Sequence, residues 1–242
     1  MKTLIKWALI AGAGLVLLIA GAVVLVPMFV DIHQYKPRIE EMVVEKTGRP
    51  FSMGDDMDLS VFPWVGVRLS DIRLGSPEGF KAKDMITVKG FEVRLKVLPL
   101  LTKQVQVKTF LVDSPQIFLE KNKSGVGNWE GLAQSEDKSQ PKTEKKDSPE
   151  KPSSGDLPIK SLMVKQFSIV NGLVVYSDAK TGLEKRLEDF NLNLSDISLS
   201  DAFPVNLSAK LDGKAFSLKT LLLASPSQVA LSDGEFKLDD ST

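Results

Sequence analysis

The sequence contains no cysteine and a single histidine, His33, among its 242 residues. Without cysteine the chain can form neither a disulfide nor a thiolate metal site. Zinc sites usually need several His or Cys ligands, and serine or cysteine nucleophiles need a histidine base. We therefore expect no enzyme, no catalytic residue, no metal and no cofactor, and we interpret His33 as a residue beside a membrane interface.

The sequence also lacks a surplus of either charge, because 31 basic residues balance 31 acidic residues. Proteins that bind nucleic acid usually carry a basic patch or a net positive charge, so we expect no nucleic-acid partner. Asp55, Asp56 and Asp58 form a close acidic group. They lack the glycine and the distal glutamate of an EF-hand loop, so we interpret them as a solvated turn.

Charge is entirely missing from residues 7–30. As a helix this run would reach about 36 Å, enough to cross a hydrocarbon core with some tilt. A cleaved secretory signal is the alternative, with Ala20-Gly21-Ala22 as its site, but the apolar run continues past that point. Lys2 and Lys6 precede the run, so we predict a transmembrane anchor with residues 1–6 in the cytoplasm.

Residues 134–156 have no Ile, Leu, Val or Phe and carry three prolines and many charges. Such a segment buries too little apolar surface to offset its chain entropy, so we predict a disordered linker. It separates a first exported module, residues 31–133, from a second module, residues 157–242. The final residues interrupt a pattern of strands and turns, which is the pattern expected of a fragment of a longer protein.

One helix is predicted directly after the anchor. Pro37 suits a first turn, Gly48 suits a left-handed C-terminal position, and Pro50 prevents continuation. Between them an apolar stripe at helical spacing consists of Ile39, Met42 and Val43.

Beyond this helix the apolar residues alternate with polar ones, which predicts half-buried β-strands. In the first module the alternating residues are Val65, Val67, Leu69, Phe91, Val93, Leu95, Val97, Val105 and Val107. In the second they are Leu192, Leu194, Ile197, Leu199, Val205, Leu207, Ala209, Leu211, Phe216, Leu218, Phe236 and Leu238.

Short strands with Ser, Asp, Asn and Gly turns predict an antiparallel meander, because parallel pairing would need crossover helices. The fold is therefore predicted to be mostly β. Its one-sided sheet could close as a barrel, pack as a sandwich, or curl around an open apolar groove. Alternation alone leaves these three outcomes open.

Several short motifs follow one another beyond the predicted anchor. They are Tyr35-Lys36-Pro37, Thr47-Gly48-Arg49-Pro50, Phe62-Pro63-Trp64 with Val65-Gly66-Val67, Ser70-Asp71-Ile72-Arg73-Leu74, Leu98-Pro99-Leu100-Leu101 and Gly127-Asn128-Trp129. In this order they resemble the AsmA family of bacterial envelope proteins. The resemblance assigns structural motif positions to Tyr35, Pro37, Thr47, Gly48, Arg49, Pro63, Pro99, Asn128 and Trp129.

The resemblance implies a bacterial inner-membrane anchor, a periplasmic β-rich body, and a curled antiparallel sheet that supports outer-membrane assembly by binding or passing phospholipid. Family members are longer, and the sheet that this chain can form is too short to cross the envelope by itself. The alternative is a scaffold or regulator that contacts envelope proteins and holds no lipid.

Two sets of candidate site residues follow. The lipid-groove candidates are Phe91, Val93, Leu95, Val97, Val105 and Val107. The candidates for contact with the membrane interface are Phe62 and Trp64, because aromatic rings with a polar edge prefer such interfaces. The sequence gives no indication of the oligomeric state.

Overall fold

The computed structural model describes residues 32–61, 64–100, 104–132, 162–198, 200–225 and 228–239. The predicted anchor at residues 7–30 and the predicted linker at residues 134–156 lie outside these ranges, as do Phe62, Pro63 and Leu199. Within the described ranges, every helix is too short or too polar to cross a bilayer.

The predicted helix is confirmed as α2 (Lys36–Thr47), which follows the 3₁₀ helix η1 (Ile32–Tyr35). Pro37 occupies its first turn, where a missing N–H costs nothing. Gly48 ends it with a φ of 65°, and its N–H donates to the carbonyl of Val44 at 2.8 Å. No side chain of α2 is buried, so the apolar stripe that includes Ile39 and Met42 remains largely exposed.

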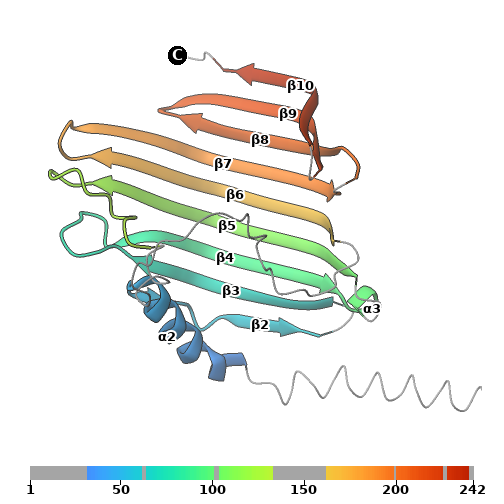
Figure 1. Cartoon of the computed structure of the whole chain (residues 1–242), viewed down its shortest axis with the longest axis horizontal. Helices are drawn as coiled ribbons and strands as arrows, with labels where there is room; N and C mark the ends of the chain where they lie inside the picture. Colours follow the sequence, from blue (N-terminus) through green and yellow to red (C-terminus); the bar gives the residue numbers. More distant parts are fainter. Residues whose placement is uncertain are drawn as a thin grey trace, which may run out of the picture.

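Ten strands form one sheet (Figure 1). They are β1 (Phe51–Ser52), β2 (Met57–Ser60), β3 (Trp64–Gly75), β4 (Asp84–Lys96), β5 (Val105–Lys121), β6 (Leu162–Asp178), β7 (Leu183–Ile197), β8 (Phe203–Leu211), β9 (Lys214–Ser225) and β10 (Gln228–Leu238). The order is β1-β3-β4-β5-β6-β7-β8-β9-β10, and β2 also pairs with β3. Within the described residues the first and last strands of this order do not pair with each other, so this part of the chain forms an open sheet.

One pairing contradicts the predicted antiparallel meander. β5 and β6 run parallel along most of their lengths, from Val105 opposite Leu162 to Lys121 opposite Asp178. The antiparallel prediction is confirmed for the other named strand pairs. It was wrong for this pair because it considered only the short turns within each module. The chain between Lys121 and Leu162 is long enough for a crossover connection. This pair joins strands from both predicted modules in one continuous sheet.

A second correction concerns Val97, which was predicted to lie in a strand. It begins α3 (Val97–Leu100), a single helical turn after β4. Pro99 lies within this turn, where its ring is tolerated and its missing N–H removes no ladder bond. The carbonyl of Pro99 accepts the N–H of Gln104 at 3.0 Å.

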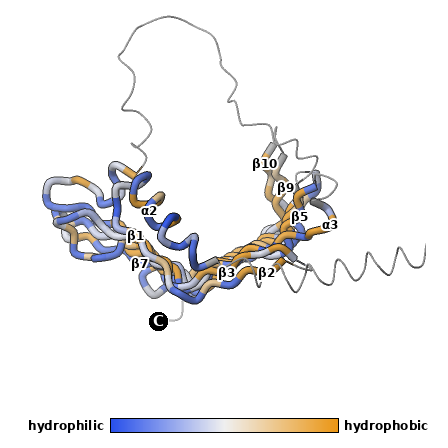
Figure 2. The backbone as a smooth tube through the Cα atoms, turned by 90° about the horizontal axis from the view of Figure 1, so that it is seen from below, coloured by the Kyte–Doolittle hydropathy of each residue, from blue (hydrophilic) through white to orange (hydrophobic). Residues whose placement is uncertain are grey.

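The sheet is curved, with α2 on its inner side (Figure 2). The bend coincides with left-handed residues that lie at the same level in four strands, namely Asp71, Ser114, Asn171 and Asp189. Asp or Asn occupies three of these four positions, and these two residue types tolerate a positive φ better than most others. A positive φ within a strand rotates the chain and interrupts the strict alternation of its faces.

Fully buried hydrophobic side chains are few among the described residues. They are Met53, Met57, Met85, Val175, Phe203 and Ala209. Most other apolar strand residues are half-buried. A packed sandwich would instead bury one whole face of each sheet. The described part of the chain is therefore an open, curled sheet.

Candidate functional site: an apolar inner face

A row of apolar residues crosses nine strands, each residue directly opposite the next in the strand pairing. The row is Met57, Leu69, Phe91, Val112, Ile169, Leu192, Leu207, Leu218 and Phe236. Residues opposite one another in neighbouring strands share a face of the sheet. The nine side chains therefore lie on one face, from β2 to β10.

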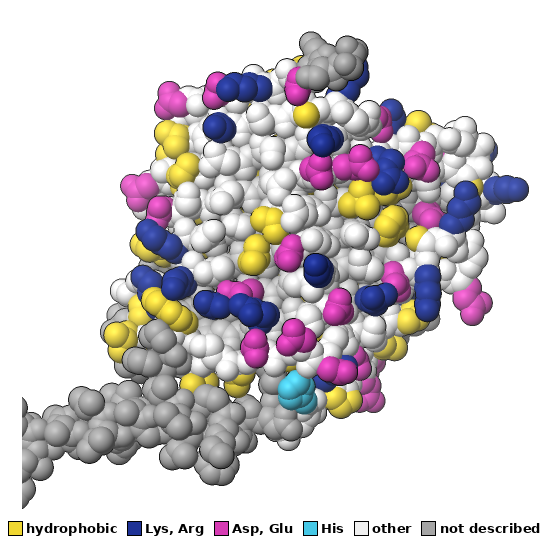
Figure 3. Space-filling model, turned by 180° about the vertical axis from the view of Figure 1, so that it is seen from behind, with side chains coloured by type: hydrophobic (Ala, Val, Ile, Leu, Met, Phe, Trp, Pro, Cys, Tyr) yellow, Lys and Arg dark blue, Asp and Glu magenta, His cyan; other side chains and the backbone are white. Residues whose placement is uncertain are grey.

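The adjacent residue in each strand belongs to a row on the opposite face. This second row is Asp58, Arg68, Glu92, Leu111, Ser168, Asn193, Asn206, Lys219 and Glu235. Eight of its nine members are polar or charged. Figure 3, which views the sheet from the side opposite to α2, shows acidic and basic side chains spread across it. The polar row thus lies on the outer side and the apolar row on the inner side.

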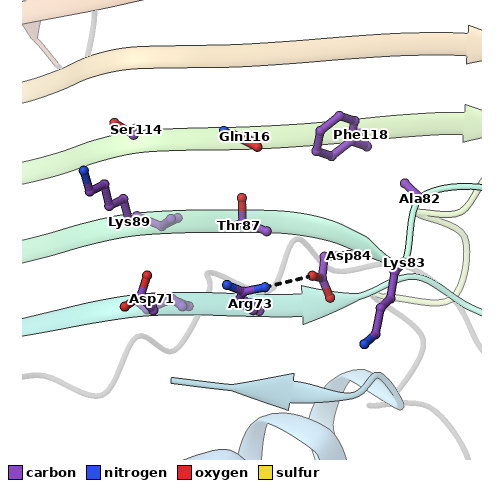
Figure 4. Close-up of a pocket in the computed structure, with 12 residues that line it drawn as sticks. Asp71, Arg73, Ala82, Lys83, Asp84, Thr87, Lys89, Ser114, Gln116 and Phe118 are labelled. Carbon is purple, nitrogen blue, oxygen red and sulfur yellow. Dashed lines mark ion pairs between the residues drawn. The ribbon is translucent and has the colours of Figure 1, made fainter. Parts of the chain in front are cut away.

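A second apolar row lies beyond the bend. It is Phe51, Leu74, Ile86, Ile117, Val174, Leu187 and Leu211. In β3, Leu69 and Leu74 are five positions apart, and strict alternation would place them on opposite faces. The left-handed Asp71 lies between them and interrupts that alternation. Figure 4 shows the polar side chains beyond the bend, including Arg73, Thr87 and Gln116, gathered around a hollow of their own.

We call the side of the sheet that carries both apolar rows the apolar inner face. Except for Met57 at the buried end and Leu211 and Phe236 at the exposed end, the side chains of the two rows are half-buried. Water therefore reaches these side chains in part, which is unfavourable for an apolar surface unless another apolar group covers it.

Aromatic rings reinforce the middle of this face. Phe110 and Phe167 are directly opposite in β5 and β6, and their rings stack with centroids 5.0 Å apart. Phe91 meets Phe110 edge-on at 5.3 Å. Such ring pairs add about 0.5–1.5 kcal/mol beyond their buried area. They strengthen the contact across β5 and β6, which form the only parallel pair among the described strands.

The structure brings five of the six lipid-groove candidates together. Phe91, Val93 and Leu95 share the apolar side of β4, and Val107 lies opposite Leu95. Val105, two positions from Val107, begins the same strand. Val97 lies apart from them in α3. Whether these side chains contact lipid stays a prediction.

Sequence reasoning missed Phe110 and Phe167 as members of this face. Arg94 lies opposite Thr109 and Leu95 lies opposite Val107, so Lys108 is the extra residue of a bulge. Because of this extra residue, the inner-face positions of β5 are odd-numbered before the bulge and even-numbered after it. The switch from Val107 to Phe110, three positions apart and both apolar, was the sign of the bulge in the sequence.

The motif residues Thr47, Gly48, Arg49, Asn128 and Trp129 cluster where α2 meets the end of β5. Arg49 is buried, and its guanidinium donates to the carbonyls of Asn128 at 3.1 Å and Glu130 at 2.7 Å. Thr47 accepts the N–H of Arg49 and donates to the carbonyl of Val43 at 2.6 Å. These bonds hold the end of α2 against the loop that follows β5.

Asn128 is completely buried within this cluster. Its amide donates to the carbonyl of Phe118 at 2.7 Å and accepts the N–H of Glu120 at 3.0 Å. The neighbouring Trp129 ring contacts the Tyr176 ring of β6 at 6.4 Å between centroids. The cluster therefore connects the end of α2 to β5 and β6.

The motif residues Tyr35 and Pro37 lie at the start of α2, with Pro37 in its first turn. Tyr35 precedes the helix, is half exposed and makes no side-chain cap. The Lys36 ammonium bonds to Asp55 at 2.5 Å. This bond raises the pKa of Lys36 and lowers the pKa of Asp55. Among the described residues, no group of His, Asp and Glu is arranged to hold a metal ion.

Trp64, the described candidate for a membrane interface, begins β3 opposite Lys96. The ammonium of Lys108 lies 3.8 Å from the centre of its ring, within the range of a cation–π contact. Leu98 of α3 follows Lys96 closely and is 71% exposed. An aromatic ring, basic groups and an exposed leucine thus lie at one end of the strands.

Comparison with known proteins agrees with this architecture. The family model described as "AsmA family" matches residues 1–241. The chain belongs to the AsmA family. It is also 31% identical over 134 residues to the AsmA family protein YhjG of Escherichia coli (strain K12). That match covers 50% of this chain and 19% of the relative, so the chain spans a small part of the relative's length.

Proposed function

We propose that this AsmA family protein is a non-enzymatic, inner-membrane-anchored envelope protein that binds phospholipid acyl chains along its apolar inner face. The apolar row that crosses nine strands without a charged residue carries this proposal. Family membership supports a role in the bacterial envelope. There the protein would support outer-membrane assembly by passing on the phospholipid that it binds.

The physical argument is the cost of exposing hydrocarbon to water. Each CH₂ group removed from water contributes about 0.8 kcal/mol, so an acyl chain favours a partly exposed apolar strip over solvent. A β-sheet supplies such a strip because alternation places every second side chain on one face while the backbone hydrogen bonds remain intact. The inner face offers this environment from strand to strand.

The strip formed by the described strands is short. Nine strands at about 4.8 Å spacing extend roughly 40 Å, which accommodates acyl chains but does not cross an envelope. These strands alone would therefore hold or pass lipid over a short distance.

Photo-crosslinking in cells tests this proposal with the full chain. Benzoylphenylalanine would replace Phe167 on the inner face or Asn193, an exposed residue of the polar row on β7. We expect crosslinked phospholipid, detected by mass spectrometry of the purified protein, at position 167 and not at 193. Equal lipid at both positions, or none at 167, would overturn lipid binding at this face. A protein crosslinked at 167 in place of lipid would favour the scaffold role.

The substitution Leu95→Asp provides a second test, with Gln106→Asp as its control. Leu95 is half-buried on the inner face, so a carboxylate there should leave the sheet folded and sharply reduce the amount of phospholipid that stays with the purified protein. Gln106 lies between Val105 and Val107, and Gln106→Asp should change neither the fold nor the amount of bound phospholipid. A folded Leu95→Asp protein with undiminished lipid would contradict the assignment of this face.

A further inference from the structure

The strands β3, β4, β5 and β6 carry only basic charge at the ends that lie beside α3. These ends are residues 64–67, 94–96, 105–108 and 162–165. They contain no Asp or Glu, and their charged residues are Arg94, Lys96, Lys108 and Lys165. We call these four strand ends, together with α3, the α3 end.

The other ends of the same four strands have mixed charge. They are residues 72–75, 84–87, 118–121 and 175–178. Their charged residues are Arg73, Asp84, Glu120, Lys121 and Asp178. We call them the mixed end. The surplus of basic charge therefore belongs to the α3 end and is not a property of the strands as a whole.

Two lysines of the α3 end lie beside an aromatic ring on the outer side of the sheet. Trp64 lies directly opposite Lys96, and both are next in sequence to inner-face residues, so they share the outer side. The ammonium of Lys108 lies 3.8 Å from the centre of the Trp64 ring and therefore lies on that side too.

These two lysines are not neutralised by the carboxylates around them. Glu92 pairs with Arg94, and Asp196 pairs with Lys165. Within the part of the chain that the structure describes, neither Lys96 nor Lys108 forms an ion pair. Their positive charges are thus available to an anionic partner.

Exposed apolar side chains accompany the lysines. Leu98 of α3 is 71% exposed, and Met163, opposite Gln106 on the outer side of β6, is 48% exposed. In Figure 3, basic side chains lie beside apolar ones at the lower left, on the side where α3 lies. Lysine, tryptophan and exposed apolar side chains together are typical of a protein surface that rests on an anionic bilayer.

The position of the α3 end also fits a bilayer. η1 begins at Ile32, directly after the predicted anchor of residues 7–30, and lies beside β2. Ser60, the last residue of β2, donates its hydroxyl to the carbonyl of Trp64 at 2.9 Å. The four residues of β2 span about 13 Å, so a chain that leaves the membrane before η1 keeps the α3 end within reach of the same membrane.

We propose that the outer side of the α3 end rests on the surface of an anionic phospholipid bilayer. Leu98 and the Trp64 ring lie at the level of the headgroups, and Lys96 and Lys108 neutralise lipid phosphates. A bilayer is the partner because it presents anionic and apolar groups together. The contact does not depend on lipid at the inner face, and it orients the sheet with the α3 end toward the membrane.

Fluorescence quenching tests this contact, because a chain without cysteine can be labelled at one chosen position. Full-length Leu98→Cys protein would carry a nitrobenzoxadiazole label in nanodiscs whose lipids bear a nitroxide at the headgroup. We expect strong quenching when phosphatidylglycerol is mixed with phosphatidylcholine, and little in phosphatidylcholine alone. Leu183→Cys, an exposed leucine opposite Asp178 at the mixed end, is the control and should be quenched in neither.

Charge reversal identifies the groups responsible. A lysine close to an anionic surface strengthens binding about five-fold, so Lys96→Glu combined with Lys108→Glu should reduce quenching at position 98 to the level at 183. Lys123→Glu combined with Lys180→Glu, at exposed positions just beyond the mixed end, should leave the quenching at 98 unchanged.

Leu95→Asp separates this contact from lipid binding at the inner face, because it should leave quenching at position 98 unchanged. Quenching at 98 that is absent, equals that at 183, is the same in both kinds of nanodisc, or survives reversal of Lys96 and Lys108 would overturn the proposal. In cells, benzoylphenylalanine at position 98 that captures a protein and no phospholipid would overturn it in favour of a protein partner.

Discussion

Asn128 shows at the scale of single residues how a motif can be structural. Its amide joins the carbonyl of Phe118 to the N–H of Glu120, and its own carbonyl accepts from Arg49. Two backbone groups of β5 therefore depend on this one completely buried side chain. Thr47 and Gly48 form the end of α2 beside Arg49. The Thr47 hydroxyl donates to the carbonyl of Val43, and Gly48 adopts the left-handed conformation that ends the helix.

Asn128→Leu should lower the free energy of unfolding by about 2–4 kcal/mol, because it keeps the side-chain volume and leaves two part-buried backbone groups without their hydrogen-bond partner. Tryptophan fluorescence during urea unfolding would measure the change. Asn122→Ala is the control, since Asn122 bonds to Ser124 and Val126 in an exposed turn of the same loop. A loss no larger than that of the control would contradict the structural role.

Asp212 provides a pH-dependent prediction. The Lys185 ammonium at 2.6 Å and the N–H of Arg186 at 3.0 Å lower the pKa of this carboxyl below its ordinary value. A lowered pKa means that the folded state favours the carboxylate, so the stabilisation is present at neutral pH. It is lost as the pH falls through the folded pKa.

The unfolding midpoints of the natural protein and Asp212→Asn should therefore differ at neutral pH and converge as the pH falls through the folded pKa, which lies below the ordinary aspartate value. Urea unfolding at a series of pH values measures this difference. A constant difference across the series would show that the ionised carboxyl contributes nothing specific.

At the scale of elements, the strands are bent where left-handed residues align. Asn171 has a φ of 56°, and its N–H donates to the Asn191 side chain of β7 at 3.0 Å. Asn191 in turn donates to the carbonyl of Asp189, which is also left-handed. The bend is thus held by side chains that bridge two strands at the same level.

Asn171→Val should destabilise the protein by about 1–2 kcal/mol relative to Asn171→Gly, because a β-branched residue is strained at positive φ and glycine is not. The comparison uses urea midpoints of the two variants. Equal midpoints would indicate that the left-handed conformation at position 171 carries no strain.

At the scale of the whole molecule, the inner face is a path only if it is uninterrupted. Ile169 lies on β6, in the middle of the apolar row, with strands on both sides. A carboxylate at this point would separate the two halves of the row by a group that acyl chains cannot solvate. The expected effect is therefore on passage along the sheet and not on the fold.

With benzoylphenylalanine at Val67 on β3 or Leu218 on β9, Ile169→Asp should leave lipid crosslinking at 67 and abolish most of it at 218. This expectation assumes entry of lipid near the predicted anchor. Asn193→Asp, at an exposed position on the outer side of the neighbouring strand β7, should leave both signals unchanged. Loss at both positions in a folded protein would show that the two halves do not act as separate stretches of one path.

The sequence by itself determined the helix α2, its ends, and the amphipathic strands, because Pro37, Gly48 and alternation act through local geometry. Phe91, Val93 and Leu95 were placed on one face for the same reason. Their partners could not be predicted, because bulges such as that at Lys108 change the phase and pairing depends on residues far apart in the chain. Only the tertiary structure decided that β5 and β6 run parallel, that the sheet remains open, and that one apolar row crosses nine strands. These features depend on register and bending, which arise from hydrogen bonds between strands and not from any one segment.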